Sequence, residues 1–157
     1  MLRRSVICFG FLLMTVSLLQ AENAQPVAIE WEKDLDRAKS TMAEGSQPMV
    51  LFISAPGCHY CELMKQKVFT QPWISKEISQ NYVPVMINGQ DQKELATRLQ
   101  IRAYPAIVIV HPTGAVMQIA RGYKNPTEFA KFLNHGKAKL DFYSKTLASR
   151  ERSTKLK

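Results

Sequence analysis

The sequence contains the stretch Met49-Val-Leu-Phe-Ile-Ser-Ala-Pro-Gly-Cys-His-Tyr-Cys61, from which the fold prediction starts. Its first five residues are apolar, and a short apolar run bounded by turn-forming residues is typical of a strand covered on both faces. The residues from Ser54 to Gly57 predict a turn, and a helical pattern follows the second cysteine. Cys58 and Cys61 therefore lie where a buried strand gives way to a helix.

This placement suits a reactive pair of cysteines. Two intervening residues let the sulfurs meet across the first helical turn, so a disulfide can open and close with little backbone movement. Free backbone N–H groups and the helix dipole stabilise a thiolate at Cys58, whereas Cys61 lies one turn further in. We expect Cys58 to exchange bonds with a substrate and Cys61 to resolve the mixed disulfide. His59 and Tyr60 are candidates for shifting the pKa of the Cys58 thiol, although His59 could simply face solvent.

Other interpretations of the pair have less support from the sequence. A structural disulfide stays open as an alternative, but so short a loop removes little entropy from the unfolded chain. Zinc needs four ligands, and His111 and His135 are isolated, so we expect no metal site. Covalent haem requires a histidine directly after the second cysteine, where the chain has Glu62. We expect the reaction to need no cofactor.

The N-terminus has the layout of a secretory signal. Residues 1–4 are basic, residues 5–19 carry no charge, and Ala21 offers a small residue for cleavage. The apolar run is shorter than the ~20 residues of a spanning helix, which makes a permanent anchor the weaker alternative. We expect residues 1–21 to be a cleaved signal peptide and the protein to be periplasmic or secreted. Cleavage would remove Cys8 and leave only the Cys58–Cys61 pair.

Apolar runs alternate with helical patterns along the rest of the chain, and this predicts an α/β fold with a mixed sheet and helices on both faces. Asp91 is expected to cap a helix, and Gly136 to follow the end of the last one. The predicted strands are residues 49–53, 82–87, 106–110 and 115–120. The predicted helices are residues 31–43, 62–70, 72–78, 91–99 and 125–135.

Charge divides the chain into a domain at residues 22–136 and a basic C-terminal tail at residues 137–157. The domain holds twelve Lys and Arg against eleven Asp and Glu, whereas the tail holds seven against two. The tail could be a solvated, partly helical extension, or it could be attracted to an anionic lipid surface or an acidic partner. We expect no nucleic-acid binding, because no stacking motif accompanies the charges.

Two separated motifs stand out in the chain, Ala55-Pro-Gly-Cys-His-Tyr-Cys61 and Ile101-Arg-Ala-Tyr-Pro105. The first is similar to the active-site loop of the thioredoxin family and the second to its cis-proline segment, and the similarity extends over residues 27–136. Two further segments, Val68-Phe69-x-x-Pro72-x-Ile74 after the active-site helix and Tyr82-Val-Pro-Val85, resemble secreted or periplasmic proteins of the thiol:disulfide interchange type. The resemblance implies a three-layer α/β/α sandwich with a central mixed sheet. It also implies that Pro105 is cis beside the cysteines and that Tyr104 binds an extended client peptide through its backbone.

The sequence departs from cytoplasmic thioredoxins at two places near the cysteines. Those relatives carry a buried Asp six residues before the first cysteine, where this chain has Phe52, and His59 and Tyr60 replace the usual residues between the cysteines. The missing acid removes a candidate proton acceptor for Cys61.

The principal hypothesis is an exported thiol–disulfide oxidoreductase, either reductase or oxidase/isomerase. Its expected partners are cysteine-containing protein substrates and a redox partner protein that could be membrane-bound, and we expect a monomer. The rival hypotheses are a binding or metallo/cofactor-assembly factor that uses the dithiol as a ligand or clamp, and an inert domain that acts through its tail.

Overall fold

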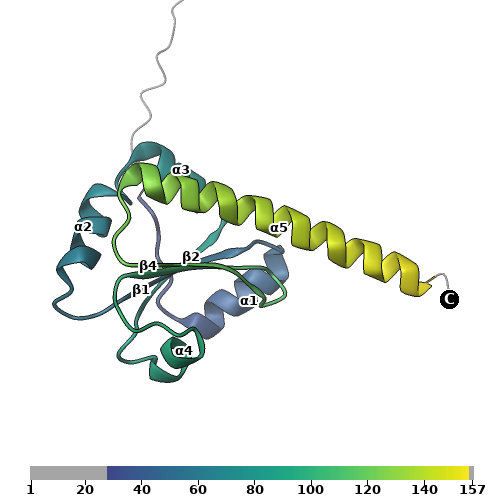
Figure 1. Cartoon of the computed structure of the whole chain (residues 1–157), viewed down its shortest axis with the longest axis horizontal. Helices are drawn as coiled ribbons and strands as arrows, with labels where there is room; N and C mark the ends of the chain where they lie inside the picture. The colour runs from purple at the N-terminus through teal and green to yellow at the C-terminus, as the bar shows by residue number, and fades with distance from the viewer. Residues whose placement is uncertain (1–27, 156–157) are drawn as a thin grey trace, which may run out of the picture.

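A computed structural model describes residues 28–155, which form four strands and five helices (Figure 1). The expected signal peptide at residues 1–21 lies outside the described residues. The elements are α1 (Leu35–Gly45), β1 (Met49–Ser54), α2 (His59–Lys67), α3 (Pro72–Asn81), β2 (Val83–Asn88), α4 (Lys93–Arg98), β3 (Ala106–Val110), β4 (Val116–Arg121) and α5 (Pro126–Lys155).

The strands form one sheet in the order β2-β1-β3-β4. The strand before the cysteines, β1, pairs with β2 in parallel and with β3 antiparallel, and β3 pairs antiparallel with β4. The prediction of a mixed sheet is therefore confirmed. Because β1 has a neighbour on each side, the segment that leads into Cys58 is held from both edges.

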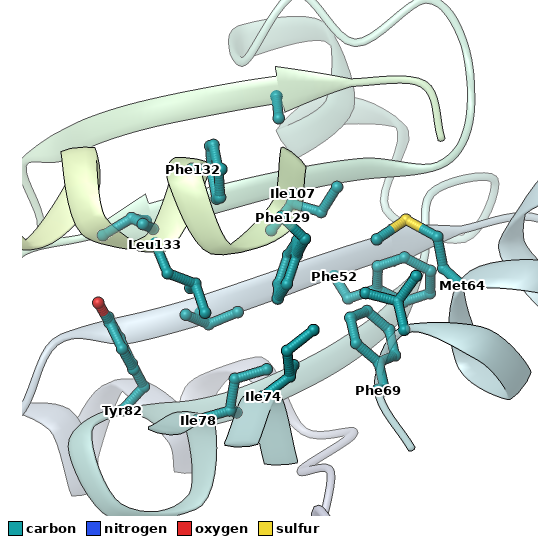
Figure 2. Close-up of a cluster of buried hydrophobic side chains, with 14 of the residues drawn as sticks. Phe52, Met64, Phe69, Ile74, Ile78, Tyr82, Ile107, Phe129, Phe132 and Leu133 are labelled. Atoms are coloured by element: carbon teal, nitrogen blue, oxygen red, sulfur yellow. The ribbon is translucent and has the colours of Figure 1, made fainter. Parts of the chain in front are cut away.

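The two faces of the sheet are covered by different helices, as the sequence pattern predicted. Successive β1 side chains point to opposite faces, so Val50 and Phe52 pack with α2, α3 and α5, while Leu51 and Ile53 pack with α1 and α4. Figure 2 shows the first of these clusters, in which Phe129 of α5 lies over the sheet near Phe52. The result is the expected α/β/α sandwich.

The first helix begins at Leu35, later than the predicted start at residue 31. Trp31 packs on Phe52 and Phe69, and Glu32 forms a bridge with Val85 of β2, so this segment is extended. Asp34 then caps α1 by accepting from two backbone N–H groups, which satisfies donors that the first helical turn leaves free.

Asp91 does not cap α4, so that prediction was wrong. Its carboxylate instead accepts from the side-chain amide of Asn88 at 2.8 Å, within the turn after β2. The helix begins at Lys93, and its N-cap residue, Gln92, makes no side-chain capping bond. The acid therefore stabilises the turn rather than the helix.

Gly136 does not end the last helix, which is a second correction. Asn125 and Glu128 start α5 with reciprocal side-chain to backbone hydrogen bonds, and the helix then runs for 30 residues to Lys155. Gly136 is buried where α5 crosses β3, and a Cβ atom there would overlap Cδ1 of Ile109. The glycine permits a close approach of helix and sheet, and the described part of the predicted tail continues the helix.

Candidate functional site

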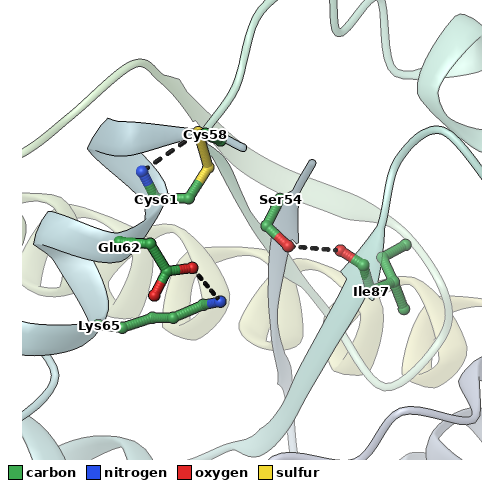
Figure 3. Close-up of a disulfide and its surroundings, with 6 residues drawn as sticks. All are labelled: Ser54, Cys58, Cys61, Glu62, Lys65 and Ile87. Carbon is green, nitrogen blue, oxygen red and sulfur yellow. Dashed lines mark hydrogen bonds and ion pairs between the residues drawn. A yellow bond between two sulfur atoms is a disulfide. The ribbon is translucent and has the colours of Figure 1, made fainter. Parts of the chain in front are cut away.

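A disulfide joins Cys58 and Cys61 at the start of α2, where the sequence placed the reactive pair (Figure 3). The Cα atoms are 5.2 Å apart, within the usual span of a disulfide. Cys58 is half-buried, whereas Cys61 is 1% exposed. The difference in exposure gives Cys58 the better access to an external sulfur.

The helix N-terminus acts directly on the Cys58 sulfur. Cys58 is the N-cap residue of α2, and its Sγ accepts a hydrogen bond from the backbone N–H of Cys61 at 3.2 Å. The helix starts at His59, three residues before the predicted start, because the N-cap lies at Cys58. A donor fixed by the helix backbone would favour the ionised sulfur over the neutral one after reduction.

Glu62 follows the pair, but its charge is paired. Its carboxylate accepts from the Lys65 ammonium group at 2.8 Å, one turn along α2 (Figure 3). The ion pair is largely exposed, so its contribution to stability is small. It places a positive charge beside the carboxylate and so reduces the electrostatic effect of Glu62 on the disulfide.

An aromatic cluster occupies the core behind the site, where the resemblance implied a carboxylate in cytoplasmic thioredoxins. Phe52 is fully buried. The ring centroid of Phe69 lies 4.9 Å from that of Phe52 and 5.0 Å from that of Trp31. Within residues 28–155 the buried polar or charged side chains are Ser75 and His111. In this part of the chain Cys61 therefore has no buried carboxylate to accept its proton.

Tyr104 and Pro105 precede β3 and are joined by a cis peptide bond. The Pro105 carbonyl accepts from the N–H of Gly122 at 2.8 Å, which ties this segment to the loop after β4. The Tyr104 ring lies against Gly89, close enough that a Cβ atom at Gly89 would be 2.6 Å from the phenol oxygen. Cys58 and Tyr104 both border the core cluster on the α5 side of the sheet.

His59 and Tyr60 both face solvent, and Tyr60 is 56% exposed. Their rings lie 5.5 Å apart, and Tyr60 also approaches Tyr123, with ring centroids 6.1 Å apart. Tyr123 was not among the site residues predicted from the sequence. The sequence signal that could have identified Tyr123 is its position directly after Gly122, whose N–H binds the Pro105 carbonyl.

The described residues also bear on metal-binding and membrane-spanning sites. Between residues 28 and 155 no three His, Cys, Asp or Glu side chains come together as a metal-binding group. Over the same residues, no helix has the length and apolar character needed to cross a membrane.

The sandwich fold, with a disulfide across the first turn of a helix that follows a central strand, defines the class of protein-disulfide oxidoreductases. Comparison with known families specifies the class further, because the profile of a thioredoxin-like domain matches residues 35–137. The chain belongs to this thioredoxin-like family. None of the curated proteins compared with the chain matches it.

Solved structures with the same fold include thioredoxins and Dsb proteins. A DsbH oxidoreductase is 16% identical, with a TM-score of 0.62 over 79% of this chain and 92% of that one. A thioredoxin from Thermus thermophilus is 21% identical, with a TM-score of 0.65 over 73% and 91%. The C-terminal domain of Neisseria meningitidis DsbD, in its oxidised form, is 16% identical, with a TM-score of 0.57 over 68% and 98%.

Proposed function

We propose that the protein is an exported oxidoreductase that exchanges disulfides with protein substrates through Cys58 and Cys61. The observation that carries the proposal is the hydrogen bond from the Cys61 N–H to the Cys58 sulfur, at the more exposed end of the disulfide. It combines access with a fixed donor for a thiolate, the two properties that a reactive cysteine needs.

In the reducing direction, the Cys58 thiolate attacks one sulfur of a client disulfide. A mixed disulfide forms, and the other client sulfur leaves as a thiolate. Cys61 then loses its proton to solvent and attacks the Cys58 sulfur, which releases the second client thiolate and closes the internal disulfide. Two electrons pass to the client, whose thiolates take up two protons. The reverse sequence oxidises a client dithiol.

Tyr104 and Pro105 serve as the client-binding segment in this proposal. This assignment is supported by the hydrogen bond from the Gly122 N–H to the Pro105 carbonyl, which holds the backbone of the segment against the loop after β4. An extended peptide can pair with backbone groups on such a segment. His59 and Tyr60 contact the same peptide and modulate the Cys58 thiol in this proposal, and their exposure next to Cys58 supports it.

The proposed location is periplasmic or secreted, on the basis of the N-terminal sequence. The redox partner would be a second dithiol or disulfide protein, which restores the starting state after each cycle.

Single serine variants of the two cysteines test the mechanism. Cys58→Ser should abolish insulin reduction and the oxidation of a dithiol peptide, because the attacking sulfur is gone. Cys61→Ser should instead accumulate a covalent complex with the client, which non-reducing electrophoresis followed by reduction would detect. The Tyr143→Phe variant, on α5, serves as the control and should keep the native rate.

Retention of the native rate by Cys58→Ser would contradict the proposal. So would stoichiometric metal binding by the reduced protein without any turnover, because that result assigns the dithiol a ligand role.

A further inference from the structure

The C-terminal half of α5 extends beyond the sheet, away from the disulfide. The family match ends at residue 137, whereas the helix continues to Lys155, an additional length of about 27 Å at 1.5 Å per residue. Figure 1 shows α2 at one end of the molecule and the end of α5 at the other. Whatever binds this extension therefore leaves the active site accessible.

This extension is basic. From residue 137 to residue 155 the helix carries six Lys and Arg against two Asp and Glu. The ion pairs found among residues 28–155 join Arg37 to Glu32, Lys39 to Asp36, and Lys65 to Glu62, so none involves the extension. Its positive charge is thus not neutralised by the folded part that the structure describes.

An exposed aromatic side chain lies among these charges. Phe142 is 74% exposed, and Lys139 and Lys145 are three residues before and after it, so all three lie on one face of α5. Val116, 45% exposed on the edge strand β4, and Met117 form a shallow apolar groove beside Phe142. We call Phe142, Lys139, Lys145 and Val116 the basic aromatic surface.

We propose that the basic aromatic surface docks the protein on an anionic lipid bilayer. Lysines at the rim would neutralise lipid headgroups, while the Phe142 ring and Val116 would enter the boundary between headgroups and acyl chains. A second copy of the chain is disfavoured as the occupant, because two such basic helices would repel each other. The proposal does not depend on the cysteine chemistry.

The Phe142→Trp variant of the full chain gives a local readout, because its fluorescence is quenched when residue 142 contacts brominated acyl chains. Trp31 and Trp73 contribute background, which the parent protein measures under the same conditions. Vesicles of brominated phosphatidylcholine containing phosphatidylglycerol should quench Trp fluorescence of the variant beyond that of the parent. Vesicles without phosphatidylglycerol should quench it less, and high salt should abolish the difference.

Charge variants in the Phe142→Trp background identify the surface. Lys139→Gln with Lys145→Gln should raise the lipid concentration for half-maximal quenching about 25-fold, at about fivefold for each lysine. Lys76→Gln with Lys93→Gln removes the same charge from exposed positions on α3 and α4 and should leave quenching unchanged.

Absence of extra quenching by the anionic vesicles would overturn the proposal. An equal loss of quenching in the Lys139→Gln/Lys145→Gln and Lys76→Gln/Lys93→Gln variants would also overturn it. A blue shift of the residue 142 emission with polyglutamate but not with vesicles would assign the surface to an acidic protein. A blue shift without lipid, together with a doubled mass in solution, would assign it to a second copy of the chain.

Discussion

Replacing Gly89 by alanine should destabilise the protein, because the added Cβ would meet the ring of Tyr104. The ideal Cβ lies 2.6 Å from the phenol oxygen and 2.8 Å from Cζ, and the ring Cε1 is closer still. Ordinary contact begins at 3.4 Å, so the ring must move by roughly 1 Å to relieve the repulsion. Overpacking of this kind costs about 1–3 kcal/mol. We expect the lower half of that range, since Tyr104 is half-buried and can shift outward.

A double-mutant cycle measured by urea unfolding separates this contact from other effects of the substitution. In a Tyr104→Ala background the ring is absent, so Gly89→Ala should cost little, and the coupling free energy should be about 1–2 kcal/mol. Gly45→Ala at the end of α1 is the matched control, because its nearest neighbours lie 3.9 and 4.0 Å away. Equal costs of Gly89→Ala in both backgrounds would refute the reasoning.

The same substitution should affect client exchange, because Tyr104 belongs to the proposed client-binding segment. Displacement of the ring should slow the reaction with a peptide disulfide, while the reaction with a small dithiol should keep its rate. Stopped-flow measurements would give the rates of the reactions with the peptide disulfide and with the small dithiol separately. A parallel loss with both would indicate that the substitution acts on the disulfide itself.

Two further predictions concern Gly136 on α5 and His111, which follows β3. Gly136→Ala should lower the free energy of unfolding by about 1–2 kcal/mol, because the overlap costs more than alanine gains in helix propensity. Adding Ile109→Val to this variant removes the overlapping Cδ1 atom and should recover part of the loss. Unfolding curves that show no recovery would contradict this. Burial lowers the pKa of His111 from 6.5, so the fold favours the neutral ring. The His111 contribution to the free energy of unfolding should therefore be constant above about pH 6.5 and should fall as the pH drops below that value. His111→Asn should flatten that fall and His135→Gln, at an exposed position, should not; identical pH profiles for the two variants would exclude His111 as the cause.

The sheet and the cysteine pair could be predicted because their signals are local. Apolar runs of strand length, such as residues 49–53, report burial on both faces directly. The spacing of Cys58 and Cys61 next to such a run specifies a disulfide across a helical turn. These features need no knowledge of distant residues.

The features that the sequence analysis missed depend on contacts between distant segments. Gly136 follows a helical pattern and therefore predicts a helix end, unless Ile109 of β3 is known to pack against it. Asp91 fits a helix cap until the amide of Asn88 binds it. The approach of Tyr123 to Tyr60 likewise depends on how the loop after β4 lies against α2.

The redox equilibrium of the Cys58–Cys61 pair with glutathione tests the central claim most directly. Reactive pairs of this type have potentials between about −270 and −120 mV, whereas structural disulfides lie below about −300 mV. We predict that the pair is reduced in a single two-electron transition whose potential lies within the first range. Mass spectrometry after thiol trapping measures the fraction of reduced protein at each glutathione ratio. A pair that stays oxidised at every accessible glutathione ratio would show that the disulfide is structural and would contradict the account.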